Sequence, residues 1–475
     1  MEWLSLLSTE KLVAEEGEPD VFSQYPINEF EKDYNKIVSS AAFRRLQDKT
    51  QVFPLDKSDF IRTRLTHSIE VSTIARQLGI MISKNTTKYK PKDINGVEAE
   101  KIASILLCAG LLHDLGNPPF GHFGETVIGD WFKDALKSIQ YKGKPLTSWL
   151  SPQMVADLEN FEGNAQSLRI LLKATHNSGI NLSFAIVSTL VKYPTNSLSV
   201  EKDSADIRKH KLGYYLAEEE TFKHISENVG TLKENELYRH PLTFMLEAAD
   251  DIAYATADLE DAFKKGLFTL NDFINYFNSS FNQDRIVEHG SPEYYSHILI
   301  ENLIERCQKE SPNKAFKAWL NYTRRWLMYV AVYRFSYKYK EIMEGSYSGD
   351  LFEETNHALT IEILKKAMKK FAYDTPGILK LELSAQTILS FLLKNFVHAV
   401  LYYDYQDEVN QYVPSKADKK YISIFSDNYK HDYDDAKMGD ESFDLYLRLL
   451  MVTDYISGMT DSYARTLYRE LSGIE

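Results

Sequence analysis

The chain has little of what marks secreted or membrane-spanning proteins. Two cysteines, Cys108 and Cys307, in 475 residues are too few for a disulfide framework or a cysteine-rich zinc site, and they fit a reducing compartment. No apolar stretch approaches the roughly 18 residues that a membrane-spanning helix needs. The N-terminus has no basic segment followed by a long apolar run, so we expect no signal peptide. These absences predict a cytoplasmic protein without a membrane anchor.

Positive charge is also scarce. The 55 Lys and Arg residues stand against 68 Asp and Glu residues, which gives a formal net charge of −13. This balance does not favour a general nucleic-acid binder or a protein attracted to anionic membranes. The hydrophobic fraction of 44% and the charged fraction of 26% are ordinary for globular proteins, so wholesale disorder is excluded.

Glycine and proline are few, at 21 and 14 residues. Apolar residues recur at three- and four-residue spacing and seldom alternate, which favours an all-α fold. Residues 101–112 are apolar almost all round and predict a buried central helix. Residues 241–265 begin with proline and are followed by Gly266, the usual signals for the start and stop of a helix.

The chain contains no repeat or low-complexity linker that would divide it clearly. Residues 200–235 mix charged residues with a Gly-Tyr-Tyr patch and predict an irregular insertion. We expect a helical catalytic core with inserted loops over residues 1–310. A helical C-terminal lobe over residues 311–475 would pack on this core, so that the two form one compact unit.

A His-Asp dipeptide ends the predicted buried helix. The chain contains two such dipeptides, His113-Asp114 and His431-Asp432, and the dipeptide alone carries little information. The first follows an apolar helix and leads into the sequence LGNPPFGH. The second lies in an acidic, aromatic, loop-like stretch that we interpret as solvated surface. The first dipeptide is therefore the candidate for chemistry.

Two other segments carry residue types that bind metals. His67 opens an amphipathic segment, where a histidine is commonly a cap or a core residue. Asp250, Tyr254 and Asp258 have four-residue spacing, which would align them on one helix face. Carboxylates beside alanines on an apolar helix need a metal, a cation or hydrogen bonds, unless they form an exposed acidic stripe.

Together these segments supply two imidazoles and two carboxylates, from His67, His113, Asp114 and Asp250. This mixed set of nitrogen and oxygen donors suits Mn²⁺, Fe²⁺, Co²⁺, Ni²⁺ or Zn²⁺, or Mg²⁺ with retained waters. Such a site would polarise a phosphate oxygen and lower the pKa of a bound water.

Four longer motifs occur in an order that resembles a known family. They are RTRLTHS at 62–68, HDLGNPPFGHFGE at 113–125, FEGNAQ at 161–166 and EAADDIAY at 247–254. Shorter matches are FRRLQ at 43–47, KYP at 192–194, GYY at 213–215 and SGMTD at 457–461. This set resembles the deoxyguanosinetriphosphate triphosphohydrolases of the HD-domain superfamily, from about residue 30 to residue 470.

The resemblance implies an HD-type helical core that hydrolyses dGTP, or other dNTPs, to a deoxynucleoside and inorganic triphosphate. Water would attack the α-phosphorus, with Mg²⁺ or Mn²⁺ as the preferred ion. The implied metal ligands are His67, His113, Asp114 and Asp250. His122 and Glu125 would then lie beside the scissile bond, where their i, i+3 spacing lets Glu125 hold the His122 ring. Whether His122 protonates the leaving 5′ oxygen or helps to place the attacking water stays open.

The same resemblance implies a pocket for the rest of the substrate. Arg64 and Lys192 are the matched cations for the triphosphate. Tyr254 would pack against the sugar and leave no room for a 2′-hydroxyl, while Asp258 would contact the 3′-hydroxyl. Gln47 and Tyr193 are further candidates for substrate binding.

One departure from the family pattern concerns base or subunit contacts. Ser462 follows the SGMTD motif where many relatives carry arginine, so a basic contact at this position is in doubt. No matched residue reads the guanine edge. The resemblance also implies a homo-oligomer, commonly a tetramer or hexamer, and the 30 Tyr and 25 Phe residues would suit subunit interfaces.

Two alternative functions remain open. Another HD phosphohydrolase would cleave nucleoside monophosphates or cyclic dinucleotides, and product analysis would separate these reactions. A nucleotide sensor or single-stranded DNA-binding protein with a vestigial site is the second, although the intact ligand set argues against it. The basic segment KKAMKKF at 365–371 could contact nucleic acid, but such a run is more commonly a solvated helix face. A regulatory nucleotide bound between subunits is a further expectation from the resemblance.

Overall fold

The computed structural model describes residues 1–14, 27–53, 61–94, 96–173, 179–373, 376–405 and 413–474. Helices dominate these residues and confirm the all-α prediction. The strands among them form two short antiparallel pairs, β1 (Gln140–Tyr141) with β2 (Lys144–Pro145) and β3 (Leu232–Lys233) with β4 (Glu236–Leu237). No helix in the described ranges has the length and apolar character needed to cross a membrane.

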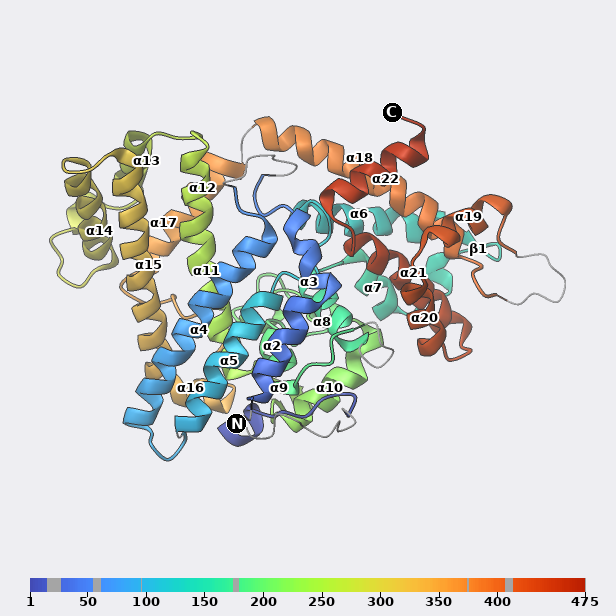
Figure 1. The fold of residues 1–475 in the computed structure, drawn as a ribbon, viewed down its shortest axis with the longest axis horizontal. Helices are drawn as coiled ribbons and strands as arrows, with labels where there is room; N and C mark the ends of the chain where they lie inside the picture. Colours follow the sequence, from blue (N-terminus) through green and yellow to red (C-terminus); the bar gives the residue numbers. More distant parts are fainter. Residues whose placement is uncertain are drawn as a thin grey trace.

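Two hydrophobic clusters organise the helices (Figure 1). The first cluster is built from α1 (Trp3–Leu6), α2 (Glu29–Ser39), α3 (Ala41–Arg45), α4 (Arg64–Tyr89), α5 (Gly96–Leu112), α8 (Gly163–Leu172), α9 (Phe184–Leu190), α10 (Glu219–Asn228), α11 (Pro241–Ala253), α12 (Leu259–Lys264), α13 (Leu270–Ser279), α14 (Pro292–Cys307), α15 (Pro312–Tyr337), α16 (Tyr339–Glu344) and α17 (Ala358–Met368). The second is built from α6 (Gly121–Ser138), α7 (Pro152–Glu159), α18 (Pro376–Val400), α19 (Lys416–Ile424), α20 (Asp427–Ala436), α21 (Glu441–Ser457) and α22 (Asp461–Ser472).

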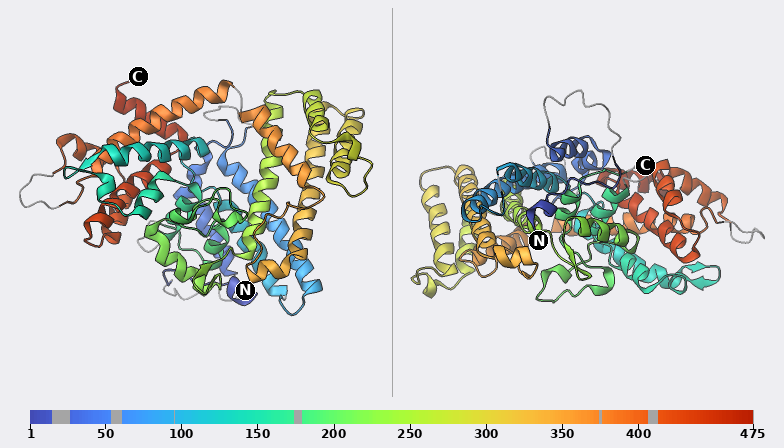
Figure 2. Two further views of the ribbon diagram at one scale, coloured as in Figure 1. Left: turned by 180° about the vertical axis from the view of Figure 1, so that it is seen from behind. Right: turned by 90° about the horizontal axis from the view of Figure 1, so that it is seen from below.

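The order of the helices along the chain does not follow the two clusters. Helices α6 and α7 lie with α18–α22, whereas α15–α17 lie with the N-terminal helices, as two further views show (Figure 2). Helix α18 contributes Ile378 to the first cluster and residues from Ala385 onward to the second. The proposed boundary at residue 310 stays a prediction, and both clusters draw on residues from either side of it.

Helices α4 and α5 form the centre of the first cluster. The predicted buried helix is confirmed as α5, in which Ile102, Ile105 and Leu106 have no exposed surface. Gly110 of α5 lies directly against the α4 backbone at Ser72, where a Cβ atom would clash. This close approach places the start of α4 beside the end of α5, which is where the two predicted histidine ligands lie.

The helical segment predicted over residues 241–265 is also present. It consists of α11, a π-helical turn η7 (Tyr254–Asp258) and α12, and it ends before Gly266, whose φ of 74° is left-handed. The π-helical turn was not predicted. Such wide turns interrupt α-helices rarely and are frequent at functional sites.

Two expectations from the sequence are wrong in part. The segment 200–235 was expected to be irregular, yet it contains α10 and begins the β3–β4 pair. The dipeptide His431-Asp432 was expected in a solvated loop, yet it lies on α20, and Asp432 is buried. Its carboxylate lies 3.2 Å from the Lys173 ammonium, so a cation distant in sequence compensates its burial.

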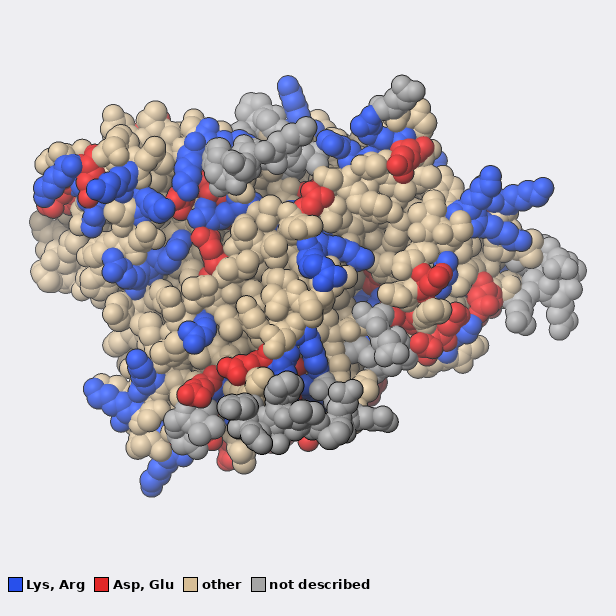
Figure 3. Space-filling view, viewed as in Figure 1, with Lys and Arg blue, Asp and Glu red and all other residues tan. Residues whose placement is uncertain are grey.

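The charged surface is mixed. On the face drawn in Figure 3, basic and acidic side chains are interspersed among large uncharged areas. Within the basic segment 365–371, Lys365 pairs with Asp251 at 2.8 Å and Lys366 pairs with Glu362. These pairs reduce the positive charge that this segment presents to a nucleic acid.

Candidate active site

The first turn of α4 presents two of the predicted site residues. Thr63 caps the helix: its hydroxyl accepts from the Thr66 amide, and the Thr66 hydroxyl accepts from the Thr63 amide. Arg64 and His67 follow within one turn of this cap and are both buried. The capping box therefore fixes where α4 begins. This start places Arg64 and His67 on the first turn of the helix, where both side chains are buried.

The end of α5 presents His113 and Asp114. Nδ1 of His113 donates to the Gly110 carbonyl at 2.8 Å, which leaves the lone pair of Nε2 for another partner. This Nε2 is buried without a hydrogen bond. The amide of Asn117 donates to Oδ1 of Asp114 at 2.5 Å, so that Oδ2 of Asp114 faces the same side as the imidazole.

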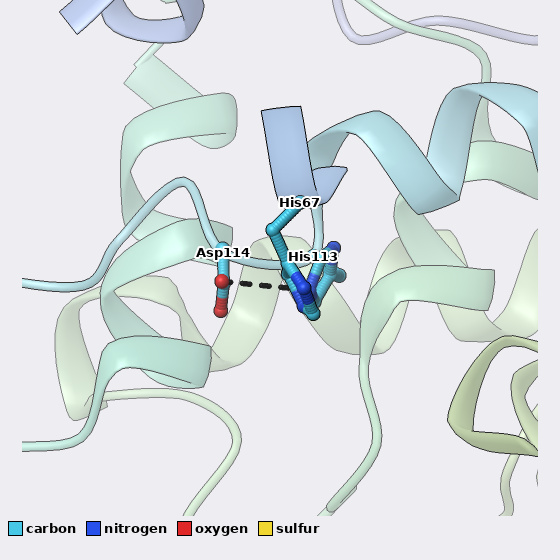
Figure 4. Close-up of side chains that lie close together, drawn as sticks. All are labelled: His67, His113 and Asp114. Atoms are coloured by element: carbon cyan, nitrogen blue, oxygen red, sulfur yellow. Dashed lines mark ion pairs between the residues drawn. The ribbon is translucent and has the colours of Figure 1, made fainter. Parts of the chain in front are cut away.

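Three of the four predicted metal ligands lie close together. The ligand atoms of His67, His113 and Asp114 are within 4.8 Å of one another, and the two rings are 5.4 Å apart (Figure 4). Asp250 of α11 lies beside the two histidines of this group, since its Oδ1 lies 3.5 Å from Nε2 of each. Donor atoms at about 2.1 Å from one ion would be roughly 3 to 3.5 Å apart. The residues therefore fit a divalent cation.

Burial opposes a charged His67, but the nearby carboxylates of Asp250 and Asp258 outweigh it and raise the pKa of this ring. The protonation states of the other three proposed ligands suit metal binding. Burial lowers the pKa of His113, which favours the neutral imidazole that a metal requires. Burial would raise the pKa of Asp114, but the Arg64 guanidinium and the histidines hold it well below its usual range. Burial likewise opposes ionisation of Asp250, and the Lys192 ammonium reverses this and keeps the pKa of Asp250 well below its ordinary value. Both carboxylates are thus anionic donors.

The two cations predicted to bind phosphates contact these same carboxylates. Nη1 of Arg64 lies 2.6 Å from Oδ2 of Asp114, and Nζ of Lys192 lies 2.6 Å from Oδ2 of Asp250. Both side chains line the central cavity. Gly121 makes room for Arg64, because a Cβ at this position would lie 2.6 Å from its Nη2 atom.

His122 and Glu125 interact as their spacing predicted. Nδ1 of His122 lies 2.9 Å from Oε2 of Glu125, and the other carboxylate oxygen accepts the Gly163 amide at 3.0 Å. The hydrogen bond to Glu125 raises the pKa of His122. The His122 side chain is 76% exposed, whereas that of Glu125 is 9% exposed. A buried carboxylate thus orients an accessible imidazole.

A cavity of about 260 Å³ joins these groups. The predicted residues that line it are Arg64, His67, His113, Asp114, His122, Lys192, Tyr193, Asp250 and Tyr254. Residues that line it without having been predicted are Gln51, Asn117, Asn164, Lys211, Glu247, Asp251 and Tyr373. The strongest missed residue is Lys211, a cation in the segment that the sequence suggested to be an irregular insertion.

Two predicted substrate residues lie outside this lining. Gln47 is exposed on η1 (Leu46–Asp48), and Gln51 occupies the cavity wall instead. Asp258 is fully buried behind His67, with its Oδ1 3.8 Å from Nδ1 of that ring and its Oδ2 3.5 Å from the Gln51 amide. Asp258 therefore faces the histidine, and burial raises its pKa to about 6.

Two further cavities adjoin the central one at His122. The larger, of about 520 Å³, extends past Lys211 and carries charged walls. The smaller, of about 120 Å³, is lined mainly by apolar residues such as Val52, Phe120 and Leu381, with one carboxylate, from Glu382. Its polar lining residues also include Thr50, Gln51, Arg64 and His122. His122 thus borders both a charged compartment and a mainly apolar one.

Comparison with known proteins agrees with the resemblance seen in the motifs. The HD domain family matches residues 64–148, which hold three of the four proposed ligands. A deoxyguanosinetriphosphate triphosphohydrolase-like protein of Listeria innocua is 43% identical over 451 residues, 94% of each chain. This chain belongs to the family of deoxyguanosinetriphosphate triphosphohydrolase-like proteins. Proteins of the same name from Synechocystis and Pseudomonas aeruginosa are 32% and 31% identical, over 100% of this chain and 100% and 99% of their own.

Membership supports a phosphohydrolase that acts on nucleotides. HD domains are metal-dependent, and His67, His113 and Asp114 all lie within the matched segment.

Proposed function

We propose that this protein hydrolyses dGTP, with other dNTPs as secondary substrates, to a deoxynucleoside and inorganic triphosphate. The observation that carries the proposal is the position of His122, hydrogen-bonded to Glu125, on the same cavity as the four proposed metal ligands and two cations. A bond forms between water oxygen and the α-phosphorus, and the bond from phosphorus to the 5′ oxygen breaks. The family name of the relatives supports this substrate.

His67, His113, Asp114 and Asp250 would hold a divalent ion, most simply Mg²⁺ or Mn²⁺. When bound, such an ion polarises a phosphate oxygen and lowers the pKa of water.

The other side chains bind and orient the substrate. Arg64 and Lys192 line the cavity beside the ligand carboxylates, and their charges suit the triphosphate. One proton must pass from the attacking water to the departing 5′ oxygen. Nε2 of His122 is the titratable atom placed to carry it, because Nδ1 is engaged by Glu125.

The small cavity beside His122 favours a purine base that carries hydrogen-bond donors on its edge. Of the residues that line it, Glu382 supplies the single carboxylate, which can only accept hydrogen bonds when ionised. Guanine offers two donors on its Watson–Crick edge, N1–H and the 2-amino group, whereas adenine offers one. Glu382 would therefore favour dGTP, and Glu382→Gln should narrow the difference between dGTP and dATP.

The surface of α15 supports the homo-oligomer implied by the family. Its exposed aromatic residues recur along one face at three- and four-residue spacing: Trp326, Tyr329, Tyr333 and Tyr337. Aromatic side chains are enriched in protein interfaces. Sedimentation of the wild type and of Tyr329→Ser/Tyr333→Ser would measure the subunit number, and unchanged assembly would remove this face from the interface.

The deciding experiment is product analysis. The protein, loaded separately with Mn²⁺ and Mg²⁺, is incubated with each dNTP and NTP, alone and in mixtures, and the products are separated by ion-exchange chromatography. The inactive control is His113→Ala/Asp114→Ala. The matched control is His431→Ala, which alters the other His-Asp dipeptide on α20.

Each outcome separates one function from the others. Deoxynucleoside and intact triphosphate, lost in the inactive control and retained in His431→Ala, would support the proposal. Monophosphate and pyrophosphate would place the cleavage at a different bond. Activity only in mixtures would indicate a regulatory nucleotide. Nucleotide binding without turnover would favour a binding protein.

A further inference from the structure

The SGMTD motif near the C-terminus reaches the candidate active site through Asp461. This residue begins α22, and only 2% of it is exposed. Its Oδ1 accepts the Phe120 amide at 2.9 Å. Its Oδ2 accepts the Thr50 amide at 3.1 Å and also the Thr50 hydroxyl. One buried carboxylate therefore joins two segments that are far away in sequence.

The first of these segments is the turn that delivers His122. Phe120 has a φ of 66°, and its neighbour Gly121 has a φ of 63°, so two successive residues are left-handed at the start of α6. A bulky side chain rarely adopts this conformation unless its surroundings enforce it. Phe120 has no side-chain group that could cap the turn. The bond from Asp461 supplies an external restraint, two residues before His122.

The second segment fixes the start of α4. Thr50 forms an isolated antiparallel bridge with Thr63, the capping residue of α4. The neighbouring carbonyl of Lys49 accepts the Arg64 amide at 3.0 Å. Asp461 thus ties the first turn of α4, which carries Arg64 and His67, to the first turn of α6, which carries His122.

Lys49 makes a second link between the same parts. Its ammonium donates to the Asn117 carbonyl at 2.6 Å and to the Ser457 carbonyl at 2.7 Å, and the residue is 3% exposed. Asn117 lies between the metal-binding Asp114 and the left-handed turn, while Ser457 ends α21. Both links run from the C-terminal helices to the loop between α5 and α6.

We propose that Asp461 is a positioning residue for hydrolysis: by holding Phe120 and Thr50 together, it fixes the place of His122 relative to the residues on α4. This inference rests on the role proposed for His122. It assigns a function to α21 and α22, which contribute no proposed metal ligand. It also gives a structural reason for the SGMTD motif, which lies far along the chain from the HD residues.

The test compares Asp461 variants in two backgrounds. Asp461→Ala and Asp461→Asn are made in the wild type and in His122→Ala, and kcat, KM for dGTP, the Kd for Mn²⁺ and Tm are measured. The matched control is Ser462→Ala, the adjacent residue, whose hydroxyl contacts only the exposed Asp48 side chain among the hydrogen bonds of the described residues.

We expect Asp461→Ala to lower kcat by about 10- to 100-fold, because a displacement near 1 Å has effects of that size. KM and the Kd for Mn²⁺ should be unchanged. In the His122→Ala background the same substitution should leave kcat unchanged, since the group that it positions is gone. Asp461→Asn, which keeps one acceptor oxygen, should show a smaller loss and serves if the alanine variant does not fold.

Two results would contradict different claims. If His122→Ala is strongly impaired but still has measurable turnover, and Asp461→Ala causes the same fold-loss in both backgrounds or weakens Mn²⁺ binding, the positioning role is wrong and the proposed reaction stands. If His122→Ala has full activity, the role proposed for His122 is wrong, and the positioning role falls with it.

Discussion

Gly163 lies against two side chains of the candidate site, and a single methyl group at this position should displace both of them. It begins α8, and its φ is not among the positive values, so alanine is compatible with the backbone. A Cβ at this position would collide with Oδ1 of Asn117 and would lie 2.5 Å from Oε1 of Glu125. Gly163→Ala therefore tests whether Glu125 must stay in place.

The required movement follows from these contacts. Ordinary contact with a Cβ begins near 3.4 Å, so the Glu125 oxygen must retreat by about 0.9 Å. Glu125 accepts the Gly163 amide at 3.0 Å and contacts Nδ1 of His122 at 2.9 Å. A shift of this size along either contact would lengthen it beyond hydrogen-bond range. A misplacement of this size costs about 100-fold in rate. The accompanying overpacking should cost about 1 to 3 kcal/mol of stability.

The assay is steady-state hydrolysis of dGTP together with thermal unfolding. The matched control is Gly79→Ala on α4, whose Cβ would lie 3.0 Å from Leu106 Cδ1 and 3.1 Å from Ala103 Cα, far along the helix from Arg64. It should lower Tm without lowering kcat. A Gly163→Ala enzyme with wild-type kcat, or a loss of kcat equal to that of Gly79→Ala, would refute the reasoning.

Two other predictions concern selectivity and pH. Tyr254→Ala should admit ribonucleotides, because the ring that lines the cavity would no longer exclude a 2′-hydroxyl; unchanged ratios of kcat/KM for dGTP and GTP would count against this role. Burial raises the pKa of Asp157 from 3.8 to about 6, so the folded protein binds this proton more tightly than the unfolded chain does. The contribution of Asp157 to the free energy of unfolding is therefore fully present below about pH 4 and is lost as the pH rises through about 6. In urea unfolding, the free energy of unfolding of Asp157→Asn relative to that of the wild type should therefore rise by about 1 kcal/mol between pH 5 and pH 8. A difference between the two proteins that does not change with pH would disprove the assignment.

Features encoded within one helix could be predicted from the sequence. The burial of α5 follows from apolar residues on all its sides, and the contact of His122 with Glu125 follows from their i, i+3 spacing. The boundaries of the segment 241–265 follow from Pro241 and Gly266. In each case the cause lies within a few residues of the effect, so a single sequence contains it.

Features that depend on distant segments could not be predicted in this way. Lys211 lines the cavity from a segment without a helical pattern, and Gln51, not Gln47, occupies the cavity wall because of how its loop pairs with the start of α4. The burial of Asp432 depends on Lys173, far away along the chain. Periodicity says which face of a helix is apolar, but it does not say which segment covers that face.

The charges around the central cavity lead to a last prediction, that nucleotide binding itself requires the metal. Each acidic residue that lines the cavity has a cationic partner; the pairs are Asp114 with Arg64, Asp250 with Lys192, Glu247 with Arg239, and Asp251 with Lys365. The protein wall is therefore nearly balanced in charge, and a divalent ion would add the positive charge that a triphosphate needs. Calorimetry with dGTP should show strong binding to His122→Ala with Mn²⁺ and little after chelation. Equal binding in both conditions would mean that the side chains alone hold the triphosphate, and that the balance described here does not control binding.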